Sequence, residues 1–326
     1  MHNNQPQYDA LAKISQQVKY AIDNYKKHGL LANQFSNVVI GGLGGSGIGG
    51  RITKAWSADQ FPIPVEVVSD YGLPAYANEK TLLIVGSYSG NTEETLEMYN
   101  DGKAKGCKML VLSSGGKISE LASADGLLIY PLESGFQPRM ALGYSLTHLV
   151  QIFGELIGKD LKEELNAVVE KLAVLDSYRE DAEDIFAIIT KNINKKLVIV
   201  ADAAMEAIAI RFAQQVQENA KAEAFVHTLP EANHNVIESY YGQMDSVFLF
   251  LSTARNERVG SRFEFLNSLL EVENNKVIHL QIQEYSLRSM YETIIRLDFV
   301  SLFMADQRMV DALNVPNIAS LKEFLE

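Results

Sequence analysis

Nine short apolar runs, mostly separated by segments of helix length, constrain the fold of this chain more than any other feature. Most of the runs lack the polar alternation of a half-exposed strand, which indicates that both faces of each strand are buried. Strands of this kind form parallel sheets that helices cover on both faces. Five runs lie in the first half of the chain and four in the second: 37–42, 64–70, 81–87, 108–114, 126–132, 195–202, 222–228, 245–253 and 274–282.

This pattern predicts an α/β protein with two doubly wound parallel-sheet domains that have helices on both faces. A length of 326 residues suits two domains. We expect an N-terminal helical segment at 1–35, packed outside the first sheet, and a first domain at 36–155. A helical connection at 156–192 and a second domain at 193–326, which ends in a helix, complete the chain. The two halves are not close sequence repeats, so any duplication is one of structure only.

Charge and composition exclude several classes of protein. The formal net charge of −12 argues against a nucleic-acid partner, which requires a basic surface. No apolar stretch approaches the roughly 18 residues that can span a bilayer, and the N-terminus lacks the basic and apolar regions of a signal peptide. Cys107 is the only cysteine, so an internal disulfide is impossible and a reducing cytoplasm is the expected location.

A glycine-rich segment, "GGLGGSGIGG" at 41–50, directly follows the first predicted strand. Gly42, Gly44 and Gly47 match the dinucleotide-binding pattern G-x-G-x-x-G, and Asp70 closes the next strand, so a Rossmann site competes for this segment. A Walker phosphate loop fits less well, because no Lys-Ser or Lys-Thr follows the glycines. The glycines alone do not decide between these sites.

A second loop, "SYSGNTEET" at 87–95, favours a compact phosphate over a dinucleotide. It places the hydroxyls of Ser87, Ser89 and Thr92 at the end of the third predicted strand. A phosphate can accept hydrogen bonds from these hydroxyls and from backbone N–H groups of a helix that starts near Asn91. Ser46, in the glycine-rich segment, could approach the same ligand. Ordinary strand-to-helix turns with capping residues are the simpler alternative for either loop alone.

The two loops together resemble the sugar isomerase (SIS) domain, whose Ser/Thr loop holds the phosphate of a phosphorylated sugar. Three further segments, "SGFQPRMALGYS", "QENAKAEA" and "PEANHN", are similar to the bifunctional phosphoglucose/phosphomannose isomerases. The resemblance runs from about residue 35 to the end of the chain. It implies a cytoplasmic enzyme of glycolysis, with a phosphosugar held between the two domains. On this resemblance the phosphate contacts are Ser46, Ser87, Ser89 and Thr92, and the substrate loop contains Gly44, Gly45 and Gly47.

The resemblance also implies the catalytic residues of an aldose–ketose isomerase, which opens the sugar ring and moves a proton between C1 and C2 through a cis-enediolate. That chemistry needs a carboxylate base, a cation beside the oxyanion and groups that exchange protons with oxygens. Glu218 matches the proton-shuttling glutamate and His234 the ring-opening histidine. Arg139 matches the arginine that stabilises the enediolate, and Lys322 a lysine that assists at the ring oxygen. Taken alone, each has an ordinary surface or helix-end role, and Arg139 could pair with Glu133.

No metal, nucleotide or other cofactor is predicted. His227, Glu231 and His234 have the spacing H-x3-E-x2-H, which matches no familiar zinc signature. The resemblance implies a two-fold homodimer in which His234 reaches the neighbouring subunit's site. The polar segment "PEANHN" is compatible with such a crossing.

The sequence departs from the family pattern at three places. Asp311-Ala312 stands where an Asp-Pro pair is usual, and "LNVPN" lacks a threonine linked to acceptance of the mannose epimer. "VADAAMEAI" lacks the glycines of relatives, so the second sheet is expected to supply Glu218 without binding phosphate. The leading function is interconversion of glucose 6-phosphate, and mannose 6-phosphate as a second aldose, with fructose 6-phosphate. The alternatives are an amino-sugar isomerase, a fructosamine-phosphate deglycase and a non-catalytic phosphosugar sensor.

Overall fold

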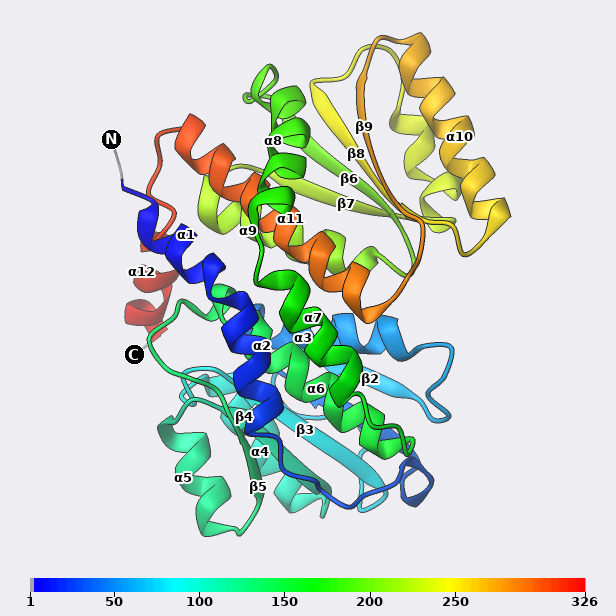
Figure 1. Ribbon diagram of the computed structural model, residues 1–326. Coiled ribbons are helices and arrows are strands. Elements are labelled where there is room, and N and C mark those ends of the chain that lie inside the picture. Colours follow the sequence, from blue (N-terminus) through cyan, green and yellow to red (C-terminus); the bar gives the residue numbers. More distant parts are fainter. Residues whose placement is uncertain (1–2, 326) are drawn as a thin grey trace. The chain divides into compact units, whose positions relative to one another are not determined.

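The computed structural model describes residues 3–325 and confirms an α/β protein with two parallel sheets (Figure 1). The chain forms two compact units. The N-terminal unit is Lys13–Ala173, and the C-terminal unit combines Met1–Ala12 with Val174–Glu326. Within residues 3–325, no helix has the length and apolar character needed to cross a membrane.

All five strands predicted for the first half of the chain form one sheet in the N-terminal unit. Every neighbouring pair is parallel, and the order is β2-β1-β3-β4-β5. Ile40 of β1 pairs with Ile84 of β3, which in turn pairs with Leu110 of β4. The strands are β1 (Asn37–Gly41), β2 (Val65–Val68), β3 (Thr81–Ser87), β4 (Lys108–Ser113) and β5 (Leu128–Pro131).

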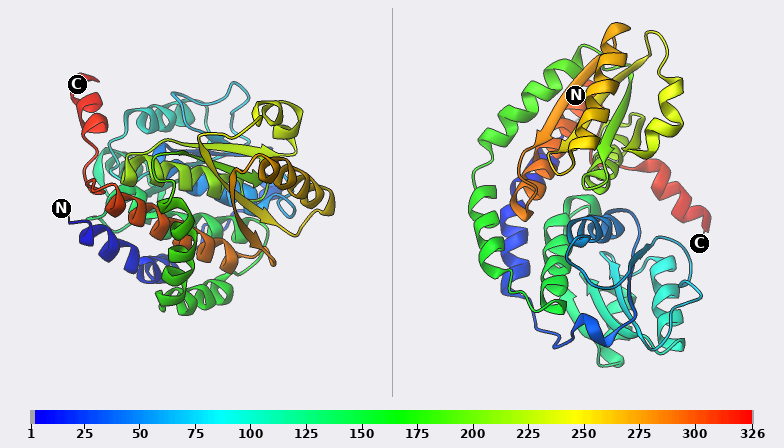
Figure 2. Two further views of the ribbon diagram at one scale, coloured as in Figure 1. Left: turned by 90° about the horizontal axis from the view of Figure 1, so that it is seen from above. Right: turned by 90° about the vertical axis from the view of Figure 1, so that its right-hand side faces the viewer.

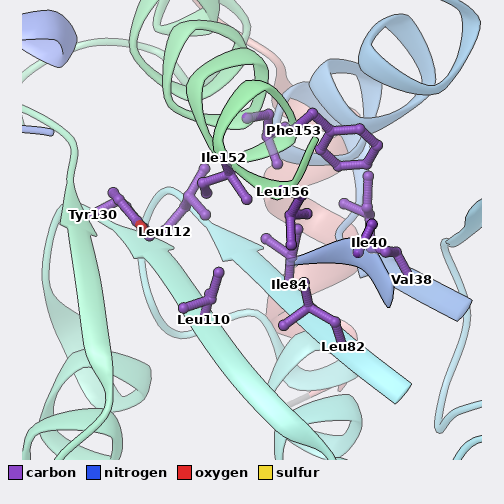
Figure 3. Packing of buried hydrophobic residues seen from close by; sticks show 12 residues of the cluster. Val38, Ile40, Leu82, Ile84, Leu110, Leu112, Tyr130, Ile152, Phe153 and Leu156 are labelled. Atoms are coloured by element: carbon purple, nitrogen blue, oxygen red, sulfur yellow. The ribbon is translucent and has the colours of Figure 1, made fainter. Parts of the chain in front are cut away.

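Helices cover both faces of this sheet, which explains why its strands lack polar alternation. On one face, buried side chains of β1, β3 and β4 pack against Ile152, Phe153 and Leu156 (Figure 3). On the other, intervening strand residues pack against Tyr99 and Ile118. The helices are α2 (Ile14–Asp23), α3 (Gly44–Ser57), α4 (Glu93–Ala104), α5 (Gly116–Ala124), α6 (Leu142–Leu156) and α7 (Lys162–Leu172), with 3-10 turns η1 (Ala32–Gln34) and η2 (Pro138–Met140).

The C-terminal unit contains the four remaining predicted strands, again all parallel, in the order β7-β6-β8-β9 (Figure 1). Figure 2 shows the chain from two further directions. This order repeats that of the first four strands in the other sheet, so the two halves share a topology without close sequence similarity. The elements are α1 (Gln5–Ala12), α8 (Asp176–Thr190), β6 (Lys196–Asp202), α9 (Glu206–Ala220), β7 (Ala224–Leu229), η3 (Glu231–His234), η4 (Val236–Ser239), β8 (Ser246–Thr253), α10 (Glu257–Val272), β9 (Lys276–Ile282), α11 (Leu287–Gln307) and α12 (Pro316–Leu325).

The N-terminal segment is divided between the two units. α1 packs on α11, where the hydroxyl of Tyr8 donates to Asp306 at 2.7 Å and its ring stacks on Phe299. α2 instead packs against α6 and α7 in the N-terminal unit. Residues 25–31 contain no helix, and residues 1 and 2 of the predicted segment lie outside the described part of the chain.

Each sheet has one point at which the strand order reverses, which is called its switch point. From β1 the chain passes to β2 on one side, whereas from β3 it passes to β4 on the other. Ligands of doubly wound sheets bind at such a point, beyond the carboxyl ends of the two central strands. The loops after β1 and β3 are the glycine-rich and hydroxyl-rich segments, so the topology brings both to one edge of the sheet. In the C-terminal unit the corresponding strands are β6 and β8.

Candidate active site

The glycine-rich loop after β1 leads directly into α3. Its residues allow close backbone packing: a Cβ on Gly47 would lie 2.3 Å from the carbonyl oxygen of Gly42, and one on Gly45 would lie 2.8 Å from the carbonyl of Pro138. Gly44 has φ +50°, a conformation that favours glycine. Leu43 at the N-cap provides no side-chain acceptor to the first amides of α3, so these N–H groups can serve an anion.

The hydroxyl-rich loop after β3 contacts the glycine-rich loop. The backbone N–H of Tyr88 donates to the Oγ of Ser46 at 3.0 Å. The hydroxyl of Ser87 donates to the Oγ1 of Thr92 at 3.1 Å and accepts from the amide of Gly90 at 3.1 Å. The hydroxyls of Ser87 and Thr92 are therefore bonded to each other, and the Ser46 hydroxyl is bonded to the backbone of the same loop at Tyr88.

Ser89 and Asn91, in the same loop, make other contacts. Ser89 is exposed, and its Oγ accepts from the amide of Asn91 at 3.3 Å. The helix predicted to start near Asn91 starts at Glu93, with Thr92 at its N-cap. The side chain of Asn91 accepts from the amide of Lys117 at 2.9 Å, across the neighbouring loop.

The loop after β4 holds the hydroxyl-rich loop in place. The amide of Ile118 donates to the carbonyl of Gly90 at 2.9 Å, and both the amide and the hydroxyl of Ser114 donate to the carbonyl of Tyr88. A Cβ on Gly90, where φ is +73°, would lie 1.8 Å from the carbonyl oxygen of Gly115. The two loops are thus interlocked through their backbones, which fixes the hydroxyls before any ligand arrives.

Arg139 lies in η2, and its side chain is 4% exposed. Its backbone nitrogen would lie 2.9 Å from a Cβ on Gly45, so the Arg139 turn packs on the glycine-rich loop. The side chain of Gln17 donates to the carbonyl of Met140 at 2.7 Å and accepts from the amide of Gly143 at 3.0 Å. No motif in the sequence singles out Gln17.

Tyr88 and Tyr144 hold the segment that leads to Arg139. The hydroxyl of Tyr88 donates to the carbonyl of Glu133 at 2.7 Å and accepts from the amide of Phe136 at 2.9 Å. The hydroxyl of Tyr144 donates to the carboxylate of Glu133, the residue considered from sequence as a partner of Arg139. Burial, aided by the Glu133 carboxylate, raises the pKa of Tyr144 far above its usual value, so this phenol remains a donor.

Glu218 lies near the end of α9 in the C-terminal unit and is half-buried. Lys221 ends this helix with a left-handed φ of 52°. Its ammonium donates to the carbonyl of Glu218 and, at 2.7 Å, to the carbonyl of Asn314. The segment that departs from the family pattern at Asp311-Ala312 is therefore tied to the helix end that carries Glu218.

A buried polar seam fixes α9 on α11. The guanidinium of Arg211 donates to the carboxylate of Asp298 at 2.6 Å, and Gln215 donates to the same carboxylate at 3.1 Å. One turn further along, Asn219 donates to the hydroxyl of Ser301 at 3.0 Å. Burial raises the pKa of Asp298, and Arg211 opposes this effect. The seam sets the register of α9 and thereby the place of Glu218.

His234 and Lys322 are both exposed within the described chain. His234 closes η3, and Asn233 of the same turn accepts from Arg262 at 3.3 Å. Lys322 lies on α12, which has no buried residue. Neither position identifies a catalytic role, so both assignments stay predictions.

The switch point of the second sheet is occupied by the chain's own carboxylate. Asp202 ends β6 and is buried. Its carboxylate accepts from the amide and the hydroxyl of Thr253, at 2.6 and 2.7 Å, and from the amide of Met205 at 3.0 Å. In residues 3–325, no group of three or more His, Cys, Asp or Glu side chains is placed to hold a metal ion.

Comparisons with known proteins identify the family of this chain. Residues 182–325 match the family described as the bacterial phospho-glucose isomerase C-terminal SIS domain. A bifunctional phosphoglucose/phosphomannose isomerase of Caldicellulosiruptor bescii is 34% identical over 339 aligned residues, which cover 98% of each chain. The chain belongs to the bifunctional phosphoglucose/phosphomannose isomerase family.

Two further comparisons support the family and the fold. The bifunctional phosphoglucose/phosphomannose isomerase of Aquifex aeolicus is 33% identical, over 90% of this chain and 91% of that one. Among solved structures, the C-terminal domain of glucosamine-fructose-6-phosphate aminotransferase from Francisella tularensis superposes with a TM-score of 0.71. That superposition covers 95% of this chain and 97% of the other at 14% identity, and it bears on the fold alone.

Proposed function

We propose that this member of the bifunctional phosphoglucose/phosphomannose isomerase family interconverts glucose 6-phosphate and mannose 6-phosphate with fructose 6-phosphate. The observation that carries the proposal is the contact between the two loops at the switch point of the first sheet, where Ser87 bonds to Thr92 and the Ser46 hydroxyl accepts from the amide of Tyr88. The Arg139 turn packs directly on the same glycine-rich loop. An anion-binding edge beside a buried guanidinium suits a phosphosugar whose reaction develops negative charge.

In this proposal the phosphate is held by Ser46, Ser87, Ser89 and Thr92 together with the first amides of α3 and α4. Neither helix has a side-chain hydrogen bond at its N-cap, so the helix dipoles and free N–H groups favour an anion there. Gly44, Gly45 and Gly47 allow the ligand and the Arg139 turn to approach the backbone. The interlocked loops make the site rigid, which lowers the entropy cost of binding.

The proton transfer is assigned to Glu218. Its carboxylate removes the proton from C2 of the open-chain aldose, which gives an enediolate. A proton then moves from O2 to O1, and the carboxylate returns its own proton to C1, which gives the ketose. Glucose and mannose differ only in configuration at C2, which becomes planar in the enediolate, so one intermediate serves both aldoses. The guanidinium of Arg139 stabilises the oxyanion. His234 and Lys322 are assigned to ring opening, where protons move to and from sugar oxygens.

We place the enzyme in the cytoplasm as a homodimer, in which His234 serves the site of the partner subunit. The exposure of His234 in η3 supports this arrangement, and the single cysteine, Cys107, fits a reducing compartment. Closed two-fold symmetry would create two equivalent composite sites.

The shared site can be tested by complementation between two inactive proteins. Glu218→Ala and His234→Ala would be mixed, dissociated and reassociated, so that half of the dimers become mixed. In a mixed dimer one site loses both residues and the other regains both, so roughly a quarter of the original activity should return. No recovery, despite demonstrated subunit exchange, would place His234 in the site of its own chain.

The proposed reaction itself is tested with purified protein and fructose 6-phosphate. Glucose 6-phosphate and mannose 6-phosphate should both accumulate, and inorganic phosphate should compete with the substrate. The reaction should continue in EDTA, because no metal is assigned a step. An absence of both aldoses would overturn the proposed function, and activity that EDTA removes and zinc restores would overturn the metal-free mechanism.

A further inference from the structure

Gln17 is a fully buried amide with two hydrogen bonds to a segment far away in sequence. It lies on α2, which packs alongside α6 (Figure 1). Its Nε2 donates to the carbonyl of Met140 at 2.7 Å, and its Oε1 accepts from the amide of Gly143 at 3.0 Å. Both of its polar atoms are thus used within one short stretch of backbone.

This stretch immediately follows Arg139. Met140 ends η2, and Gly143 lies in the first turn of α6. Contact between α2 and this stretch is tight, since a Cβ on Gly143 would lie 2.7 Å from the Cβ of Gln17. The Arg139 turn also meets Gly45, whose added Cβ would lie 2.9 Å from the Arg139 nitrogen. The turn therefore contacts both the Gln17 amide and the glycine-rich loop.

We propose that Gln17 is a positioning residue, which orients Arg139 toward the oxyanion of the proposed isomerase reaction. The inference rests on the proposed function. Gln17 touches no reacting atom. It forms hydrogen bonds with a carbonyl and an amide beside the turn, and these bonds fix the position of the backbone from which the guanidinium extends. A small displacement of a charged group weakens its interaction with the transition state far more than it weakens binding of the phosphate.

Gln151 provides a matched control. It is also a buried glutamine at the α2–α6 interface, and its Nε2 donates to the carbonyl of Ala21 at 3.2 Å. Its bond is directed to α2, away from the Arg139 turn. Gln17→Met and Gln151→Met each keep the length of the side chain and remove its amide, so both should destabilise the protein by leaving buried backbone groups unpaired.

The two variants should differ in kcat. For fructose 6-phosphate, Gln17→Met should lower kcat by about 10- to 100-fold. The KM and inhibition by inorganic phosphate should stay within about threefold, because the phosphate loops are untouched. Gln151→Met should retain kcat within about threefold. Equal kcat values for the two variants would overturn the positioning role, even if both lost stability.

A double-mutant cycle with Arg139→Ala identifies the route of the effect. If Gln17 acts through Arg139, adding Gln17→Met to Arg139→Ala should change kcat little, whereas independent effects would multiply. Multiplied effects would contradict the proposal.

Gln17→Glu supplies a second test, in case the methionine variant does not fold. A protonated glutamic acid can donate to Met140 as the amide does, and a carboxylate cannot. The kcat ratio of this variant to the wild type should therefore rise as pH falls, and a pH-independent ratio would contradict the assignment. The proposed function is judged separately, by wild-type turnover of fructose 6-phosphate. The role of Gln17 is judged by the ratios between variants.

Discussion

The contact between the glycine-rich loop and the Arg139 turn should make Gly45 unusually sensitive to a single added methyl group. In Gly45→Ala, the new Cβ would lie 2.8 Å from the carbonyl carbon and oxygen of Pro138 and 2.9 Å from the nitrogen of Arg139. These are backbone atoms on an anchored turn, so no side-chain rotation can relieve the contact. Either the start of α3 or the Arg139 turn must move.

Gly50 offers a control on the same helix. A Cβ there would also lie 2.8 Å from its nearest neighbour, but that neighbour is the Cγ2 methyl of Ile40 in the core. Overpacking of this kind costs about 1–3 kcal/mol, and we expect both variants to lose stability in that range. Only Gly45→Ala displaces the site, and a shift approaching 1 Å can cost about 100-fold in kcat/KM. Gly50→Ala should stay within about threefold of the wild type.

The assay combines denaturant unfolding of both variants with initial rates on fructose 6-phosphate. The free energy of unfolding identifies the cost of overpacking, and the ratio of their kcat/KM values identifies the effect on the site. If Gly45→Ala loses stability but keeps the activity of Gly50→Ala, the contact between the glycine-rich loop and the Arg139 turn has no role in catalysis.

Three other predictions concern the hydroxyl loop, a buried histidine and the second switch point. Ser89→Ala or Thr92→Ala removes a donor to a dianion, and such a hydrogen bond is worth about 1.5–3 kcal/mol. Each variant should raise KM and the inhibition constant of inorganic phosphate. An unchanged KM in both variants would make the loop a simple turn. Burial lowers the pKa of His148 from 6.5 to about 4, so the unfolded chain takes up this proton first as pH falls. The folded state should therefore lose up to roughly 3 kcal/mol of stability as the pH falls from 6.5 to about 4. The free energy of unfolding of His148→Leu should depend less steeply on pH than that of the wild type. An unchanged pH dependence would refute the assignment. Asp202→Ala leaves the amide and the hydroxyl of Thr253 without their carboxylate acceptor and should lower the free energy of unfolding by about 1–3 kcal/mol. Inhibition by inorganic phosphate should stay unchanged, and a change in that inhibition would place a phosphate at the second switch point.

The sequence predicted the parts of the fold that depend on local pattern. All nine strands form, because short and mostly continuous apolar runs suit strands of a parallel sheet that helices cover. The loops after β1 and β3 could also be assigned, since the carboxyl ends of parallel strands meet at one edge. The proximity of Ser46 to the loop that carries Ser87 and Thr92 could therefore be predicted from the sequence.

Contacts that depend on tertiary packing could not be predicted. Gln17 lies in an ordinary amphipathic helix, and nothing local indicates that its amide binds the backbone 123 and 126 residues away. The assignment of α1 and α2 to different units likewise depends on which surfaces they meet. Lys221 and Asp202 resemble common helix-end and strand-end residues until their partners are known. A single sequence cannot show such pairs, because each partner looks ordinary by itself.

The role of Glu218 is the central chemical claim, and isotope exchange tests it most directly. Wild type and Glu218→Gln would be incubated with fructose 6-phosphate in deuterated water, and deuterium at C1 of the ketose and C2 of the aldose would be followed by NMR. The amide keeps the size of the side chain and removes the base. We predict exchange and aldose formation in the wild type, and neither in Glu218→Gln, although the variant still binds inorganic phosphate. Retained exchange in Glu218→Gln would contradict the assignment and move the base to another carboxylate.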